Sequence, residues 1–142
     1  MTPTQEPEAE PKPRPPDVDT GFWLWMAALP LMVTAYVVDV LNAPGEIRPW
    51  YVVAISAVFV FVLAAVVVTF LLLMRTGYRW ARTLLTGGGA TSVVYVMTNL
   101  LSVDRPTTAA VVYAVSTIVG SVLIVGGTYL LHRKDVYEFF TR

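Results

Sequence analysis

The residues of this sequence that could carry chemistry are few, and the first of them lie inside long apolar segments. Asp39 is the one acid within such a segment, and Asn99 is an amide within another. An ionisable side chain is costly to bury in lipid, so Asp39 is a candidate proton or cation site. It lies close to the end of its segment, however, and this favours a solvated or ion-paired carboxylate with Arg48 or Arg105 as its partner.

A basic cluster is the second candidate. Arg75, Arg79 and Arg82 are spaced by four and three residues, which places them on one face if the segment forms a helical turn. With Tyr78 and Trp80, whose rings suit the headgroup level of a bilayer, the cluster could hold the phosphate of an anionic lipid. A role in setting membrane topology, with only nonspecific attraction to lipid, also explains these arginines and is the favoured interpretation.

Small residues recur at a spacing of four in the last two apolar segments. Gly88 and Ser92 form one such pair, and Ser116 and Gly120 form another. Pairs of this kind let helix backbones approach closely in a membrane. We expect these residues to pack the last two helices against each other, and contact with a second copy of the chain or with another membrane subunit is the alternative.

Other catalytic chemistry is not supported by the composition. The chain has no cysteine, which excludes disulfides, thiol catalysis and cysteine-ligated metal sites. Its single histidine, His132, follows the last apolar segment, and the nearest acid is Asp135 in the polar tail. We therefore expect no catalytic residue, no metal site and no cofactor. The formal net charge of zero also argues against a nucleic-acid partner.

The elements that carry these residues are predicted to be membrane-spanning helices. Hydrophobic residues make up 56% of the 142 residues and charged residues only 14%, which is well below the charge content of soluble domains. Spanning the hydrocarbon core takes roughly 20 apolar residues. We predict an all-α integral membrane protein with four transmembrane helices in an antiparallel bundle. The predicted spans are residues 22–41, 50–74, 83–103 and 107–131.

Polar segments flank the predicted transmembrane domain of residues 21–131. Residues 1–20 contain six prolines and five acids, which predicts a disordered cytoplasmic tail. Pro13 and Pro16 form a PxxP motif that could bind a cytoplasmic partner, although a solvated tail is the favoured interpretation. Residues 132–142 are predicted to form a short cytoplasmic tail. The rings of Trp23 and Trp25 are expected to anchor the start of the first span at the membrane surface.

The distribution of basic residues predicts the orientation. Eight of the ten lysines and arginines lie in the two tails and in the connection between the second and third spans. The other two, Arg48 and Arg105, lie in the remaining connections. Because basic residues accumulate on the cytoplasmic side, both ends of the chain are expected in the cytoplasm.

The stretch from Gly77 to Arg82 reads Gly-Tyr-Arg-Trp-Ala-Arg and directly precedes the third predicted span. In this stretch, and in its short basic and aromatic C-terminal tail, the sequence resembles small multi-pass membrane proteins of actinobacteria, including mycobacteria. The resemblance extends loosely over the second to fourth spans. It implies a multi-pass protein of the bacterial inner (cell) membrane and no particular activity.

Three functions are compatible with these observations. The leading hypothesis is a non-enzymatic accessory or scaffold subunit of a membrane complex, with the lipid bilayer and other membrane subunits as partners. The alternative is a small homo-oligomeric transporter or pore, because the layout is similar to that of small multidrug transporters. Those proteins carry an acid deep in the first helix, where this chain has Leu31, Met32 and Val33. A lipid enzyme is the third, but the spans hold no pair of acids or histidines.

Overall fold

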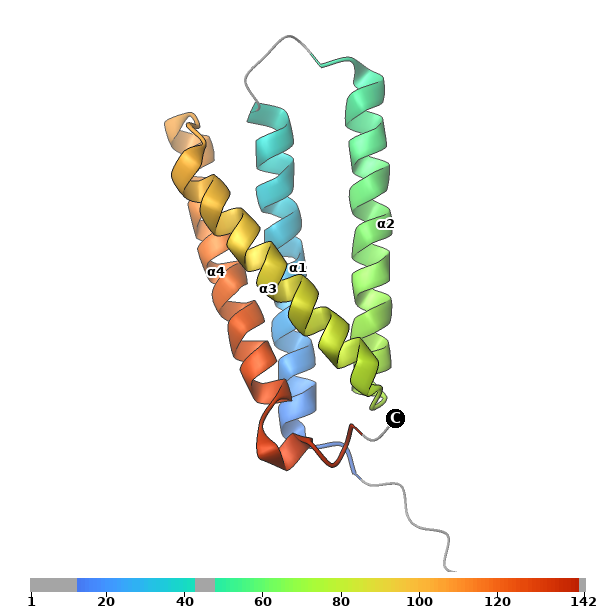
Figure 1. Ribbon diagram of the computed structural model, residues 1–142. Coiled ribbons are helices and arrows are strands. Elements are labelled where there is room, and N and C mark those ends of the chain that lie inside the picture. The colour runs from blue at the N-terminus through green and yellow to red at the C-terminus, as the bar shows by residue number, and fades with distance from the viewer. Residues whose placement is uncertain (1–12, 43–47, 141–142) are drawn as a thin grey trace, which may run out of the picture.

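The computed structural model describes residues 13–42 and 48–140, except for the side chain of Asp135. Within these ranges the chain is all-helical, and its four long helices are each long and apolar enough to cross a membrane (Figure 1). The elements are α1 (Pro16–Asn42), α2 (Trp50–Arg75), α3 (Arg79–Ser102), α4 (Thr107–Leu131) and the 3-10 turn η1 (Lys134–Val136). The ends of α1 and α3 lie with the starts of α2 and α4 at what we call the upper end, as drawn in Figure 1.

Two helices begin earlier than predicted. α1 starts at Pro16 instead of residue 22, so the prediction of a disordered tail over residues 1–20 is wrong for residues 16–20, while residues 1–12 lie outside the described residues. Proline suits the first position of a helix, and Asp17 and Asp19 lie where acids favour the helix dipole. Val18 is fully buried, so tertiary packing also holds this first turn.

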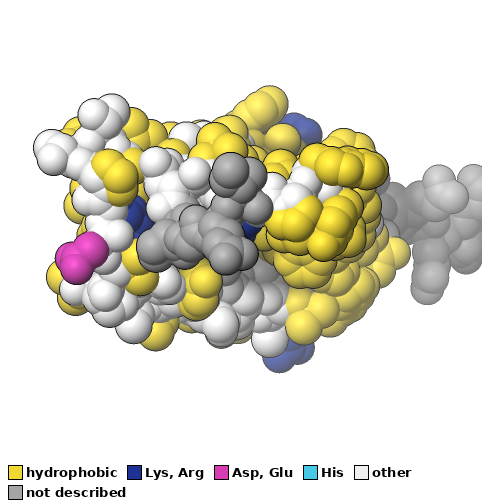
Figure 2. All heavy atoms as spheres, turned by 90° about the horizontal axis from the view of Figure 1, so that it is seen from above, with side chains coloured by type: hydrophobic (Ala, Val, Ile, Leu, Met, Phe, Trp, Pro, Cys, Tyr) yellow, Lys and Arg dark blue, Asp and Glu magenta, His cyan; other side chains and the backbone are white. Residues whose placement is uncertain are grey.

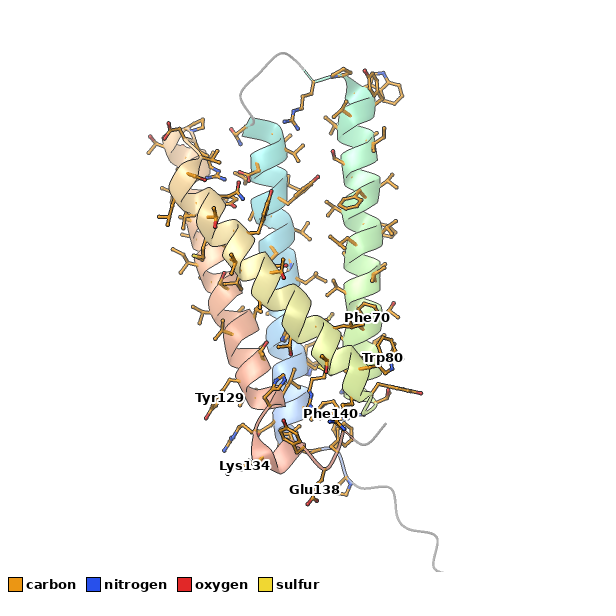
Figure 3. The ribbon with its side chains drawn as sticks, in the orientation of Figure 1. Phe70, Trp80, Tyr129, Lys134, Glu138 and Phe140 are labelled. Carbon is orange, nitrogen blue, oxygen red and sulfur yellow. The ribbon has the colours of Figure 1, made fainter. Side chains whose placement is uncertain are left out.

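The connection between α2 and α3 is shorter than the predicted loop of residues 75–82. Gly77 adopts a φ of 99°, a left-handed conformation that suits glycine, and α3 begins two residues later at Arg79. The ring of Trp80 then packs edge-on against Phe70 of α2, with 5.6 Å between the ring centroids (Figure 3). The predicted boundaries of α2 and α4 agree with the structure to within one residue.

The most extensive helix contact joins α1 and α4, which are far apart in sequence. Small residues of α4 allow the close approach. A side chain at Gly127 would lie 2.6 Å from the indole of Trp25, and one at Gly120 would contact Met32. Gly89 of α3 lies against the same indole, which a side chain at that position would approach to 2.5 Å. Trp25 of α1 is thus enclosed between α3 and α4 and is only 6% exposed, which corrects its predicted role as a surface anchor.

The core lies mainly at the lower end, where α4 ends and the C-terminal segment turns back. Val136 and Phe140 are almost fully buried and belong to one cluster with Leu71, Met74 and Leu131. The described part of the predicted 132–142 tail therefore packs on the bundle through its apolar residues.

Hydrophobic side chains cover much of the outside of the molecule. Seen from the upper end, they lie around most of the rim (Figure 2). α2 is the most apolar helix, yet its buried residues are confined to Leu71 and Met74 near its lower end. Its exposed side chains include Phe59 and Phe61. A surface of this kind is suited to lipid and not to water.

Candidate functional site

Asp39 and Arg105 form a two-pronged ion pair at the upper end. Nε of Arg105 donates to Oδ1 of Asp39 over 2.7 Å, and Nη2 donates to Oδ2 over 3.1 Å. The carboxylate comes from the last turns of α1 and the guanidinium from the connection between α3 and α4. Of the two partners predicted for Asp39, the structure therefore selects Arg105. Arg48, the other, lines the same shallow hollow of about 290 Å³ beside the pair.

The remaining contacts of Arg105 join the end of α3 to a ring of α4. Nη1 donates to the backbone carbonyl oxygens of Asn99 and Val103, over 3.1 and 3.2 Å, at the end of α3. The guanidinium lies over the ring of Tyr113 in α4, 3.6 Å from the ring centroid. Hydrogen bonds to the Asp39 carboxylate hold the pKa of Arg105 above its ordinary value, so the guanidinium stays charged. Arg105 thus acts as a cap for α3 and a bridge between α1 and α4.

The two predicted intramembrane polar residues therefore meet through Arg105. The side-chain amide of Asn99 donates to the carbonyl oxygen of Tyr95 in the same helix, over 2.9 Å. The backbone oxygen of Asn99 accepts a hydrogen bond from Arg105. The side chain of Arg105 is only 4% exposed and that of Asp39 is 32% exposed. The pair is consequently more buried than the rim ion pair expected from the sequence. Among the described residues, no group of three His, Cys, Asp or Glu side chains could hold a metal ion.

The predicted arginine cluster is separated in the structure. Nε of Arg75 donates to Asp19 of α1 over 3.0 Å, and its guanidinium lies over the ring of Phe22. Arg79 is exposed, and Arg82 is 4% exposed beneath the C-terminal segment. The three arginines therefore do not form one lipid-facing cluster, because α3 begins early enough to turn Arg82 inward, and the favoured role of these arginines in membrane topology stays a prediction.

Arg82 is held by backbone and aromatic rings. Its Nη1 donates to the carbonyl oxygen of Leu131 at the end of α4, over 3.2 Å. The rings of Tyr137 and Phe140 have their centroids 5.0 and 4.6 Å from its guanidinium carbon. Its Nε is buried and has no hydrogen-bond partner among the described residues. This contact was not predicted, although the aromatic residues of the tail were a signal for it in the sequence.

Acids at the start of α1 pair with basic residues near the ends of α2 and α4 and with one that precedes α1 itself. Asp19 forms ion pairs with Arg14, over 3.1 Å, and with Arg75. Asp17 forms an ion pair with Arg133 over 3.2 Å. Arg14 also donates to the backbone oxygen of Arg75. These pairs were not predicted, because the two acids were interpreted as part of a solvated tail. Acids that precede an apolar segment were the available signal.

The small residues predicted to pack helices divide into two groups. Ser116 and Gly120 are buried. We expected Gly120 to pack against α3, but it contacts α1 instead. Gly88 has open space where its side chain would be, and Ser92 is exposed, so neither packs within the described chain. Gly89 makes the contact instead, because it is the glycine that faces Trp25.

Comparison with known proteins gives no relative: no family model, curated protein or solved structure matches this chain.

Proposed function

We propose that this chain is a multi-pass protein of a bacterial inner membrane that serves as a non-enzymatic accessory or scaffold subunit. In this proposal the four helices span the bilayer as an antiparallel bundle, and both ends lie in the cytoplasm. Four apolar helices and the excess of basic residues near the lower end support the arrangement. The exposed apolar surface of α2 supports contact with lipid.

The observation that carries the scaffold proposal is the bonding of Asp39. Both carboxylate oxygens accept from Arg105, whose other contacts fix the end of α3 and the ring of Tyr113. A carboxylate that carries a proton or cation across a membrane must release and bind its cargo repeatedly. An acid engaged at 2.7 and 3.1 Å by a guanidinium suits a positioning role better.

The proposed topology predicts the results of reporter fusions. A reporter fused after Arg142 should be active only in a form that works in the cytoplasm. One inserted between Ala43 and Glu46 should be active only in a form that works outside it, because the basic residues near the lower end are retained inside. Cell fractionation should recover both fusions in the membrane. A C-terminal reporter active outside the cytoplasm would contradict the span number or the orientation.

A flux measurement separates the scaffold from a transporter. The purified chain, reconstituted into vesicles with a pH gradient, should let the gradient decay no faster than in protein-free vesicles. D39N should behave identically, because the carboxylate is assigned a role in holding helices together. A pH-sensitive dye inside the vesicles reports the decay. Proton flux through the wild type that D39N abolishes, at equal protein incorporation, would favour the transporter over the scaffold.

A further inference from the structure

The outward face of α4 carries a continuous row of exposed apolar side chains. Its members recur at alternating spacings of four and three residues, so they lie along one side of the helix. We call them the outer α4 row: Val111, Val115, Ile118, Val122, Val125 and Tyr129. Each is at least 48% exposed. At about 1.5 Å per residue the row approaches the thickness of a hydrocarbon core, which is long enough for an acyl chain to lie along it.

At the lower end the row runs into a basic hollow. This hollow, of about 360 Å³, is lined by Tyr129, His132, Arg133 and Lys134. Tyr129 and Lys134 project toward the same side of the lower end of α4, away from the other helices (Figure 3). A tyrosine that ends an apolar row next to basic side chains has the order expected at a bilayer surface, where rings mark the headgroup level.

Two contacts hold residues of the hollow in place while basic groups stay at its surface. Arg133 donates to Asp17 over 3.2 Å and is still 44% exposed. Nδ1 of His132 lies 2.9 Å from the carbonyl oxygen of Thr128, and because a carbonyl only accepts, Nδ1 carries the hydrogen. The side chain of Lys134 is exposed. Ammonium, guanidinium and hydroxyl groups around one hollow are suited to phosphate oxygens.

From these observations we propose that the outer α4 row and the basic hollow bind one anionic phospholipid, with its phosphate in the hollow and an acyl chain along the row. The proposal presumes the membrane insertion proposed above, which the reporter fusions test separately. The basic hollow is separate from the arginines Arg75, Arg79 and Arg82 near the α2–α3 connection.

A second copy of the chain fits this face less well than a lipid. Two copies that met through the outer α4 row with their helices parallel would bring two basic hollows together, and like charges repel. Helix association in membranes also favours small residues, and those of α4, such as Gly120 and Gly127, face α1 instead. The outward side chains are mostly branched and bulky. Charge complementarity therefore selects an anionic lipid as the occupant.

Native mass spectrometry of the full chain in mild detergent tests the site. Dioleoyl phosphatidylglycerol should bind about tenfold more tightly than dioleoyl phosphatidylcholine, because only the former carries net negative charge. K134Q should weaken the phosphatidylglycerol affinity about fivefold, the effect of one basic residue near an anionic group. R79Q is the matched control, because it removes one exposed positive charge at the same end of the molecule but outside the hollow. It should leave the affinity unchanged.

Four results would overturn the proposal. The first is equal binding of the two lipids, and the second is an unchanged affinity in K134Q. The third is an equal loss of affinity in K134Q and R79Q, which would mean that the lipid is attracted to the whole basic end and not to the hollow. The fourth concerns the source of the phosphate. Soluble glycerol 3-phosphate that displaced the lipid at an equal concentration would identify a site for a free anion in which the outer α4 row plays no part.

Discussion

Arg105 at the upper end and Arg82 at the lower end differ in how a buried guanidinium is compensated. The side chain of Arg105 is only 4% exposed, although the residue as a whole is half-buried, and Arg82 as a whole residue is 4% exposed. Arg105 has a carboxylate, two carbonyl oxygens and the ring of Tyr113 as partners. Arg82 has one carbonyl oxygen and two rings, and no carboxylate contacts it in the described part of the chain. One site neutralises charge, and the other surrounds a charge with polarisable groups.

We therefore expect the two arginines to contribute unequally to stability, although both guanidinium groups are buried. Removal of one member of a buried ion pair is costly mainly because the other charge stays behind without a partner. At the upper end this would be the carboxylate of Asp39. At the lower end no charged partner would remain, because Arg82 contacts the carbonyl oxygen of Leu131 and two aromatic rings, all of which are uncharged.

The largest effect is expected for R105M, which keeps much of the length of the side chain and removes its charge. It should lower the free energy of unfolding by about 3 kcal/mol, because Asp39 loses its partner. Unfolding in mixed micelles, followed by circular dichroism, measures the change. The matched variant is D39N/R105M, which removes both charges and should recover about 2 kcal/mol of that loss. If R105M costs the same with Asn at position 39, the carboxylate is not what makes Arg105 important.

A smaller effect is expected for R82M. The methionine keeps apolar contact with the rings of Tyr137 and Phe140, so the loss is limited to the cation–π contacts and one hydrogen bond, offset by relief of a buried charge. We expect a destabilisation of about 1 kcal/mol in the same micelle assay. A loss as large as that of R105M would contradict the comparison and would indicate an acidic partner for Arg82 outside the described residues.

The helices themselves were largely predictable from the sequence, but two of their starting points were not. Long apolar segments bounded by proline and polar residues determine α2 and α4 almost to the residue. The early starts of α1 and α3 depend on the burial of Val18 and Ala81 by segments distant in the chain. Local polarity made both first turns look like loop, and only tertiary contact makes them helix.

The candidate site was predictable in its members more than in its arrangement. Asp39 and Asn99 stand out as polar residues in apolar segments, and Arg105 was one of two bases that could reach the acid. The sequence could not choose between Arg48 and Arg105, nor show that Arg105 also contacts Tyr113 and the end of α3. Those contacts depend on the relative position of three helix ends, which no local pattern encodes.

By itself, the sequence determined that the chain has four helices long and apolar enough to cross a membrane, because the length and hydropathy of a segment are local properties. It also determined the predicted orientation, since basic residues are counted along the chain. The tertiary structure alone decided which glycine packs, Gly89 and not Gly88, and which arginine turns inward, Arg82 and not Arg79. Residues next to each other on a helix point about 100° apart, so one step in sequence separates a packed face from an exposed one. The rotation of a helix about its axis decides which residue faces the packed side, and packing against helices distant in the chain fixes that rotation.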